Sequence, residues 1–503
     1  MRENEVAVSL GRGAYCARAP YHPSEAYPES PFPGAVGAED NPAYRGVRET
    51  FVLLGLDAER AGTAEWNPLG GLVRPGDTVL LKPNFVVSRH GRGGELFSAI
   101  THPSVLRAVA DYVCIALRGR GRILIADAPQ MDCDWAQLME ATRLPEVQAF
   151  YAQQASVPLE VMDLRDFCVA DPDQAPLSTN RRTLPGDPLG SVIVDLGAGS
   201  HFAGIERHDR FYGADYDRNE TIRHHHGQVH EYSVSRTVLS ADVVISIPKL
   251  KVHKKVGVTL NVKGLVGINT NKNYLVHYRL GTPSQGGDQL PDTLGGRDRW
   301  LVRGQRFLYD TLLARRSRVA DAVYGGIRHT YRRVLKPFVR VSQQAVAFDG
   351  GNWHGNDTAW RMAVDLLKVF RFAGADGALH GTPQRRAFCL IDGVVGGEGD
   401  GPLSPDARPA GCIVAGVNPL AVDLVATRLM GFDPLRLRQF SILREPGGWD
   451  FGVRGLDEIR VRAHDPAVRE MFAGREPLLG FCPHPGWVGQ LEVQPAAPVE
   501  AAA

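Results

Sequence analysis

Residues 240–267, SADVVISIPKLKVHKKVGVTLNVKGLVG, constrain this chain more than any other stretch. The apolar run VVISI is typical of a buried strand and stops at Pro248. Five basic residues then occupy the seven positions from Lys249 to Lys255. The segment after them is rich in glycine and small polar residues, which allow a backbone to approach an anionic ligand closely. We therefore expect a buried strand that ends in a cationic loop.

Apolar strand patterns alternate with helix patterns along the rest of the chain. Residues 78–84 and 122–129 are typical of buried strands, and a helix is predicted from about residue 101 to 117 between them. A helix over 358–372 and a strand over 387–397 continue this order. The order is that of doubly wound α/β proteins, in which ligands lie beyond the carboxyl ends of the strands. We expect an α/β fold of two α/β halves with mostly parallel sheets, plus a basic helical insertion.

The length of 503 residues is too great for one ordinary core. The start has acidic residues where a secretory signal needs cations, and no run of about 18 apolar residues follows, so we expect a cytoplasmic protein. The seven cysteines are scattered without a CxxC pair, so no iron–sulfur cluster is expected. The predicted regions are an N-terminal arm (1–45), a first α/β domain (46–296), a basic amphipathic helical insertion (297–340), a second α/β region (341–490) and a disordered tail (491–503).

Polar residues follow several of the predicted strands and would converge on one crevice if the strands are parallel. Any one of them is as readily explained as a solvated loop residue, but their shared position favours a common site. The candidate anion-binding residues are Lys82, Asn84, Lys249, Lys251 and Lys263.

An acidic, glycine-rich stretch, IDGVVGGEGDGP at 391–402, is the proposed counterpart of the cationic loop. Asp392, Glu398 and Asp400 suit either a hard divalent cation or acid/base chemistry, although glycines and acids in a loop often mean only turns. His253 is the candidate base, because neighbouring lysines would lower its pKa and keep it neutral. It would otherwise only pack or face solvent. The catalytic candidates are thus His253, Asp392 and Glu398.

A second candidate metal site consists of His226 and His230, which a helix would place on one face at i, i+4. A surface or substrate-facing histidine cluster is the preferred interpretation, because Gly227 stands where the zinc-protease pattern needs Glu. The chain therefore indicates no specific cofactor, and a divalent metal ion is the one candidate.

The region 297–340 is strongly basic and has the apolar spacing of an amphipathic helical pair. Such helices pack with a solvated face on the protein body, or contact an anionic membrane surface. Nucleic acid is not expected as a partner, because no recognisable binding module accompanies the charge.

The chain contains, in this order, the motifs KPN at 82–84, IPKLKVHKKVGVTLNVKGLVG, GNWHGNDTAWR at 351–361, IDGVVGGEGDGP, and NPLAVDLVATRLMGFDP at 418–434. Together they resemble the family described as domain of unknown function 362. The resemblance implies neither a settled reaction nor an oligomeric state. Some members carry a ferredoxin-like module, for which this chain lacks the cysteines, and the arm sequence YHPSEAYPE resembles a subgroup found beside polysaccharide-assembly genes.

These observations favour an enzyme that acts on an anionic small molecule such as a carboxylate, sugar phosphate or nucleotide. Lysines would hold the anion, and acidic groups would transfer protons or bind a metal. The alternative is a non-catalytic ligand-binding or scaffold protein associated with polysaccharide or cell-envelope assembly.

Overall fold

The computed structural model of the chain describes residues 2–169, 180–214, 218–312, 317–330, 333, 342–444, 449–474 and 478–493. Each predicted region has residues outside these ranges, and for the basic insertion and the tail they are 313–316, 331–332 and 334–340, and 494–503. None of the described helices is long and apolar enough to cross a lipid bilayer.

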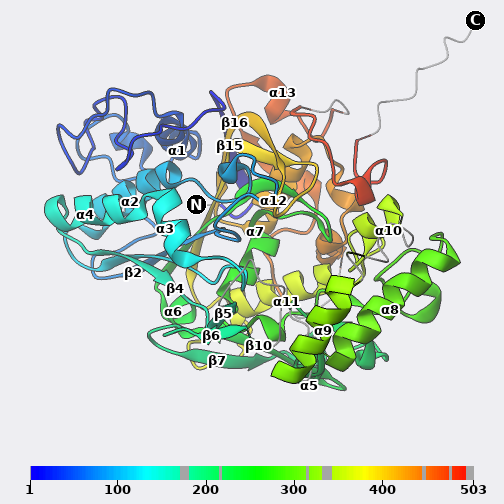
Figure 1. The fold of residues 1–503 in the computed structure, drawn as a ribbon. Helices are drawn as coiled ribbons and strands as arrows, with labels where there is room; N and C mark the ends of the chain where they lie inside the picture. The colour runs from blue at the N-terminus through cyan, green and yellow to red at the C-terminus, as the bar shows by residue number, and fades with distance from the viewer. Residues whose placement is uncertain are drawn as a thin grey trace, which may run out of the picture.

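A ten-stranded sheet forms the centre of the molecule (Figure 1). Two short strands, β12 (Lys249–His253) and β13 (Gly257–Val258), join this sheet beside β15. In order across the sheet, the other strands are β17 (Arg460–Arg462), β1 (Glu5–Leu10), β16 (Asp406–Gly416), β15 (Arg386–Glu398), β11 (Val243–Ile247), β2 (Thr78–Pro83), β3 (Arg122–Asp127) and β4 (Leu159–Asp163).

The central strands run parallel. β11 pairs in parallel with β2 on one side and β15 on the other, and β3 and β4 extend the parallel part. β16 is antiparallel to both β15 and β1. The predicted α/β class with a mostly parallel sheet is confirmed. The strands that we assigned to two halves nevertheless belong to one sheet, because β11 from the first predicted domain pairs with β15 from the second.

Helices cover both faces of this sheet. Alternate strand residues point to opposite faces, so that Val79 and Leu81 pack in one core while Leu80 packs in the other. The first face is covered by α1 (Pro42–Leu53), α2 (Pro103–Leu117), α3 (Trp135–Thr142) and α4 (Leu144–Gln154), and the second by α7 (Leu260–Gly264), α11 (Ala359–Phe372) and α12 (Pro419–Leu429).

The helix starts follow from local sequence. Pro103 and Pro419 occupy the first positions of α2 and α12, where a missing N–H costs nothing. Asn418 accepts hydrogen bonds from the amides of Leu420 and Ala421, as its position before the helix predicts.

The remaining elements are shorter or peripheral, and one of them corrects a sequence prediction. His226 and His230 do not share a helix face: they lie in a hairpin of β9 (His225–His226) and β10 (Val229–Ser235). The other elements are β5 (Phe167–Val169), β6 (Arg181–Thr183), β7 (Ser191–Asp195), β8 (Phe211–Tyr212), β14 (Tyr278–Arg279), α5 (Arg218–His224), α6 (Arg236–Ser240), α8 (Gly296–Leu312), α9 (Arg318–Thr330), α10 (Gln343–Phe348) and α13 (Pro466–Arg469).

A buried ion pair fastens the N-terminal arm to the first helical layer. Arg107 of α2 donates from Nε to Oδ1 of Asp111 (2.7 Å) and from Nη1 to the carbonyl of Pro20 in the arm (2.7 Å). The hydroxyls of Tyr44 and Tyr151 also donate to Asp111, whose side chain is 1% exposed. Without this carboxylate, the three buried donors would lose their hydrogen-bond acceptor.

Replacing Asp111 by Ala is expected to lower the free energy of unfolding by about 3–5 kcal/mol, because Arg107 would stay buried without its counter-charge. The matched control is Glu146→Ala, which breaks an exposed Arg–Glu pair on α4 and is expected to cost less than about 1 kcal/mol. Urea unfolding of both variants makes the comparison. Equal destabilisation would contradict the importance that we assign to the buried pair.

Candidate functional site

A cavity of about 360 Å³ lies beyond the carboxyl ends of β2, β3 and β11 and is lined by many basic side chains. This volume is within the range of about 300–1,000 Å³ that holds small ligands in proteins. We call it the lysine cavity, because its wall includes Lys251, Lys254, Lys255, Lys263 and Lys272.

None of these five lysines forms an ion pair with any residue that the structure describes. Lys272 donates to three backbone carbonyls and Lys251 to two, those of Ala99 and Pro402. Lys255 donates to the carbonyl of Gly350. The carboxylates in the wall are already paired, Asp127 with Lys82 and Asp349 with Arg306. The cavity therefore gathers basic groups that have no counter-charge of their own, and an anionic ligand would supply one.

Of the buried lysines among the five, Lys263 is the one that lacks a described polar partner. Its side chain is 6% exposed, and it makes no hydrogen bond with the described part of the chain. Thr259, 3% exposed and one helical turn earlier, also has a hydroxyl without a described partner. Both residues line the cavity. A buried ammonium and hydroxyl without partners cost stability unless a ligand engages them.

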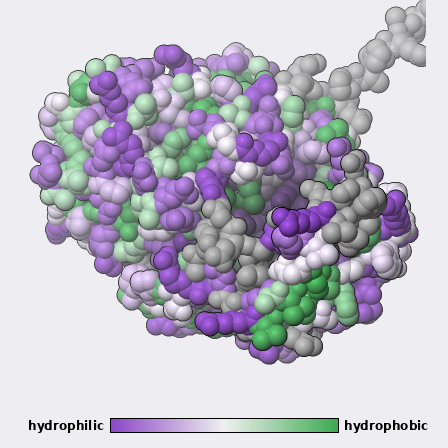
Figure 2. Space-filling view, in the orientation of Figure 1, coloured by the Kyte–Doolittle hydropathy of each residue, from purple (hydrophilic) through white to green (hydrophobic). Residues whose placement is uncertain are grey.

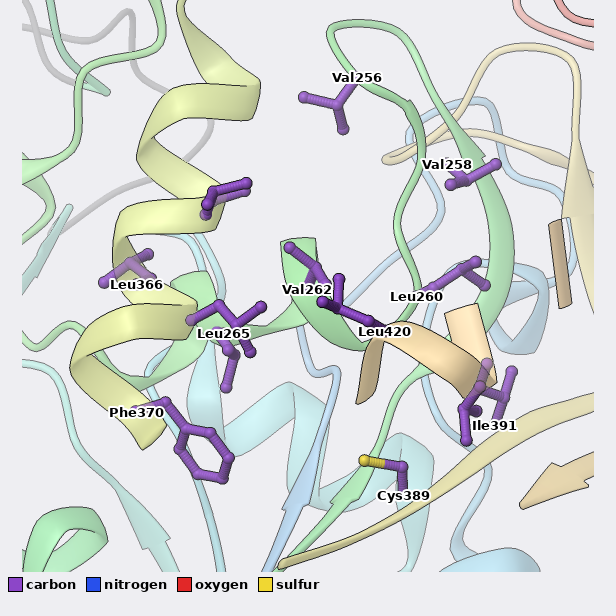
Figure 3. Close-up of a cluster of buried hydrophobic side chains, with 14 of the residues drawn as sticks. Val256, Val258, Leu260, Val262, Leu265, Leu366, Phe370, Cys389, Ile391 and Leu420 are labelled. Atoms are coloured by element: carbon purple, nitrogen blue, oxygen red, sulfur yellow. The ribbon is translucent and has the colours of Figure 1, made fainter. Parts of the chain in front are cut away.

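Packing fixes the direction in which Lys263 points. Figure 3 shows Val262 beside Leu420 of α12, and Leu265 beside Leu366 of α11, so one face of this segment is embedded in the core. Residues four apart lie on one face of a helix, and Thr259 and Lys263 therefore share the face turned to the cavity.

Asp423 of α12 anchors the first turn of α7. Its Oδ1 accepts the backbone N–H of Asn261 and its Oδ2 accepts that of Val262, both at 2.8 Å. These amides begin the helix and have no partner within it. The carboxylate therefore holds the turn that carries Lys263, although Asp423 does not itself line the cavity.

Two histidines of the wall are fixed in opposite tautomers. Nδ1 of His253 accepts the backbone N–H of Lys255 (3.0 Å), which places the hydrogen of the neutral ring on Nε2. Nδ1 of His277 lies 3.0 Å from the carbonyl of Leu275 and must donate to it, which leaves a lone pair on Nε2. His253 is thus a donor at Nε2, and His277 an acceptor.

Burial, with a further contribution from neighbouring lysines for the histidines, lowers the pKa values of these groups. Burial, followed by the charges of Lys263 and other lysines, lowers the pKa of both His253 and His277 well below its usual value. Burial alone lowers the pKa of Lys263 to about 7. A bound anion would raise all three pKa values, because it favours the protonated forms.

The predicted basic insertion contributes Arg306 to the lining of the cavity. Arg306 of α8 donates to Asp349 (3.0 Å) and lies over the rings of Tyr212 and Tyr278, which stack on each other with centroids 5.0 Å apart. Lys255 Nζ also lies over the Tyr278 ring, 5.1 Å from its centroid. The insertion therefore contributes to the site.

Lys249 and Asp392, predicted for opposite halves of a site, neutralise each other in the core. Lys249 Nζ donates to Asp392 Oδ2 at 2.7 Å, and both side chains are fully buried. Asp392 also accepts from the hydroxyl of Tyr15 and the amide of His102. The two stretches do lie side by side, since Lys249 is opposite Asp392 in the β12–β15 register. Neither residue lines the cavity.

The other predicted anion-binding residues divide between the cavity and the core. Lys251 and Lys263 line the cavity, as does Asn84, whose buried Oδ1 has no described partner. Lys82 is absent from the wall, because its Nζ donates to Asp127 (2.8 Å) and to the carbonyl of Pro83 (2.9 Å). Its charge is therefore already neutralised.

The acidic stretch does not form the metal site considered from the sequence. Glu398 accepts the amide of Cys482, and Asp400 is half exposed with His484 at 3.7 Å. Neither lines the cavity. Among the described residues, no group of three or more His, Cys, Asp or Glu side chains is arranged to hold a metal ion.

The histidine pair predicted as metal ligands is also separated. His226 is exposed on the hairpin, whereas His230 is buried among aromatic rings that include Phe202. Their side chains therefore belong to different environments, and neither lines the cavity.

The glycines of the acidic stretch serve close packing. A Cβ on Gly397 would lie 2.4 Å from the carbonyl oxygen of Ser98, and one on Gly393 would lie 2.5 Å from Sγ of Cys412. The stretch is consequently a strand packed against its neighbours up to Glu398, as predicted for 387–397, and the predicted glycine-rich loop is confined to the residues from Gly399 onward.

The sequence predictions missed Thr259, Lys272, His277 and Arg306. One available signal was the scarcity of lysine: only nine of the 57 lysines and arginines are lysine, and six of the nine lie between residues 249 and 272. Five of those six line the cavity. Lysine can lose its proton when buried, whereas arginine stays charged, so this bias itself indicates a site.

Comparison with known proteins agrees with the sequence resemblance. Residues 192–428 match the family described as Domain of unknown function (DUF362). A thylakoid-associated protein of Synechocystis sp., sll1697, is 28% identical over 204 residues, which cover 40% of this chain and 42% of that protein. The match therefore spans less than half of that relative. No solved structure matches the chain.

The cavity residues from Lys251 to His277, together with Arg306 and Asp349, all lie within the range that matches the family. The resemblance predicted from the motifs is thus confirmed: residues 192–428, slightly less than half of the chain, match the model of the DUF362 family.

Proposed function

We propose that this protein is an enzyme that binds a small anionic substrate, a carboxylate or phosphate compound, in the lysine cavity. The observation that carries the proposal is Lys263, a buried cation with no described partner, beside the unpartnered hydroxyl of Thr259. An anion that accepts hydrogen bonds from both groups satisfies them at once.

Within this proposal the two histidines have different roles. His253 donates from Nε2 to the bound anion, and His277 accepts a proton at Nε2 from the substrate. Anion binding raises the pKa of His277, because it cancels the lysine charges that oppose protonation. The base therefore becomes effective when the substrate is present, which couples binding to proton transfer.

Replacing Lys263 by Gln is expected to weaken the binding of sulfate or phosphate about 10- to 100-fold, because a hydrogen bond to a charged group contributes about 1.5–3 kcal/mol. The variant should also be at least as stable as the wild type, since it removes a buried unpaired charge. Isothermal titration and thermal unfolding measure the two effects.

The matched control is Lys368→Gln, which removes another mostly buried lysine, one that donates to the carbonyl of Gly199 outside the cavity. Its affinity for these anions should stay at the wild-type value. Unchanged affinity in the Lys263 variant would refute the proposed anion site.

Sulfate affinity is expected to fall as the pH rises above about 7. The pKa of Lys263 is about 7 in the free protein, so the amine is mostly neutral above this value and must take up a proton to bind the anion. The fall would be at most about tenfold per pH unit for one proton. Sulfate stays a dianion throughout this range, so its own charge does not interfere.

Titration calorimetry in two buffers of different ionisation enthalpy measures this proton uptake directly. The Lys263→Gln variant should show a weaker pH dependence. An affinity that rises with pH, or no proton uptake in the wild type, would contradict the role of Lys263.

Proton transfer can be detected as hydrogen–deuterium exchange. A panel of small carboxylates and sugar phosphates that bind the protein would be incubated with it in D2O and followed by NMR. His277→Gln should abolish the exchange of the reactive proton and retain anion affinity, whereas His253→Gln should mainly weaken binding. Exchange that persists in His277→Gln would refute the role of His277 as the base. If compounds bind but none of them exchanges a proton, the non-catalytic alternative is favoured.

A further inference from the structure

Helices α8 and α9 expose a stripe of large apolar side chains. On α8, Trp300 and Phe307 are seven residues apart and 73% and 68% exposed. On α9, Val319, Val323 and Ile327 are four residues apart, and Val319 is 74% exposed. Figure 2 shows an apolar area at the lower right of the molecule, where Figure 1 places these two helices. Residues at these spacings share one face of each helix.

The opposite faces of the two helices are packed. Val302 of α8 and Tyr324 of α9 are buried, and the rings of Tyr309 and Tyr324 contact each other with centroids 5.7 Å apart. Arg306 is fixed in the cavity wall by Asp349. These contacts orient both helices, so the outward direction of the apolar stripe follows from how the helices pack.

Positive charge accompanies this stripe. Residues 297–340 contain twelve lysines and arginines but three acidic residues, whereas the whole chain has a net charge of only +1. In the described part, Arg297, Arg303 and Arg318 are exposed on the two helices. The rest of the protein is therefore acidic overall, and this segment concentrates its positive charge.

We propose that α8 and α9 dock the protein onto an anionic lipid bilayer. Trp300, Phe307 and the α9 stripe would enter the interfacial region, while the arginines bind lipid phosphates with their stems along the apolar surface. An anionic bilayer suits both the apolar stripe and the arginines, because its hydrocarbon region lies directly below a negatively charged surface. Nucleic acid would use the charge but leave the apolar stripe in water.

Docking through these helices would bring the lysine cavity to the membrane surface. α8 supplies Arg306 to the cavity wall, and the distance from the docking stripe to the cavity is thus the width of one helix. The docking proposal does not depend on the proposed chemistry, because the stripe and its charge lie outside the cavity.

Vesicle flotation of the full chain tests docking. The protein is expected to float with vesicles of phosphatidylcholine containing one third phosphatidylglycerol, and to stay in the soluble fraction with phosphatidylcholine alone. Trp300→Ser combined with Phe307→Ser should reduce the bound fraction about tenfold or more, because it removes the two largest inserted side chains. Higher salt should weaken the binding of the wild type.

The matched control is Val488→Ser, which removes an apolar side chain that is 63% exposed elsewhere on the surface. It should float like the wild type, and thermal unfolding should show both variants folded. Failure of the wild type to float at low salt would overturn the proposal, as would equal flotation of the double variant. Concentration-dependent self-association that the double variant abolishes, without vesicle binding, would instead assign the stripe to a second copy of the chain.

Discussion

The buried pair of Lys249 and Asp392 determines the arrangement of the centre of this protein. It ties β12 to β15, and through the hydroxyl of Tyr15 it ties both strands to the N-terminal arm. Because the pair is fully buried, removal of either partner would leave the other as an uncompensated charge. β12 is therefore held in register, and the next alternate residues of the same strand, Lys251 and His253, are directed into the cavity.

Lysine, in preference to arginine, gives the cavity its chemistry. A guanidinium keeps its proton even when buried, whereas burial lowers the pKa of Lys263 to about 7 and leaves it able to gain or lose a proton under neutral conditions. The cost is an unpaired buried cation in the free protein. Anchoring of α7 by Asp423 and the apolar packing of Val262 prevent this lysine from turning out to solvent. Lys263 therefore has no partner within the described protein, and the free energy of pairing it contributes to ligand binding.

Most of the fold could be predicted from the sequence, because buried strands and capped helices have local signals. The candidate site was harder to predict, because the register between paired strands decides which carboxylate each lysine meets. The alternation of KLKVH is itself a strand pattern, with Leu250 and Val252 in the core, but its charges suggested a loop. Whether Lys249 or Lys251 is neutralised depends on the β15 residue opposite, which no local pattern specifies. His277 was missed because its role depends on a backbone carbonyl two residues away.

Helix α8 connects the two proposed sites physically. Its inner face carries Arg306, which contacts Asp349 and the stacked tyrosines of the cavity, and its outer face carries Trp300 and Phe307. A helix moves as one body over so short a distance, so any shift of α8 on docking is transmitted to Arg306. Linkage then requires the coupling to be reciprocal: an anion in the cavity must change the affinity for a bilayer by the same factor by which the bilayer changes the affinity for the anion. A helix with no contact to the cavity could not produce this dependence, and the ion pair between Arg306 and Asp349 is the contact through which it would act.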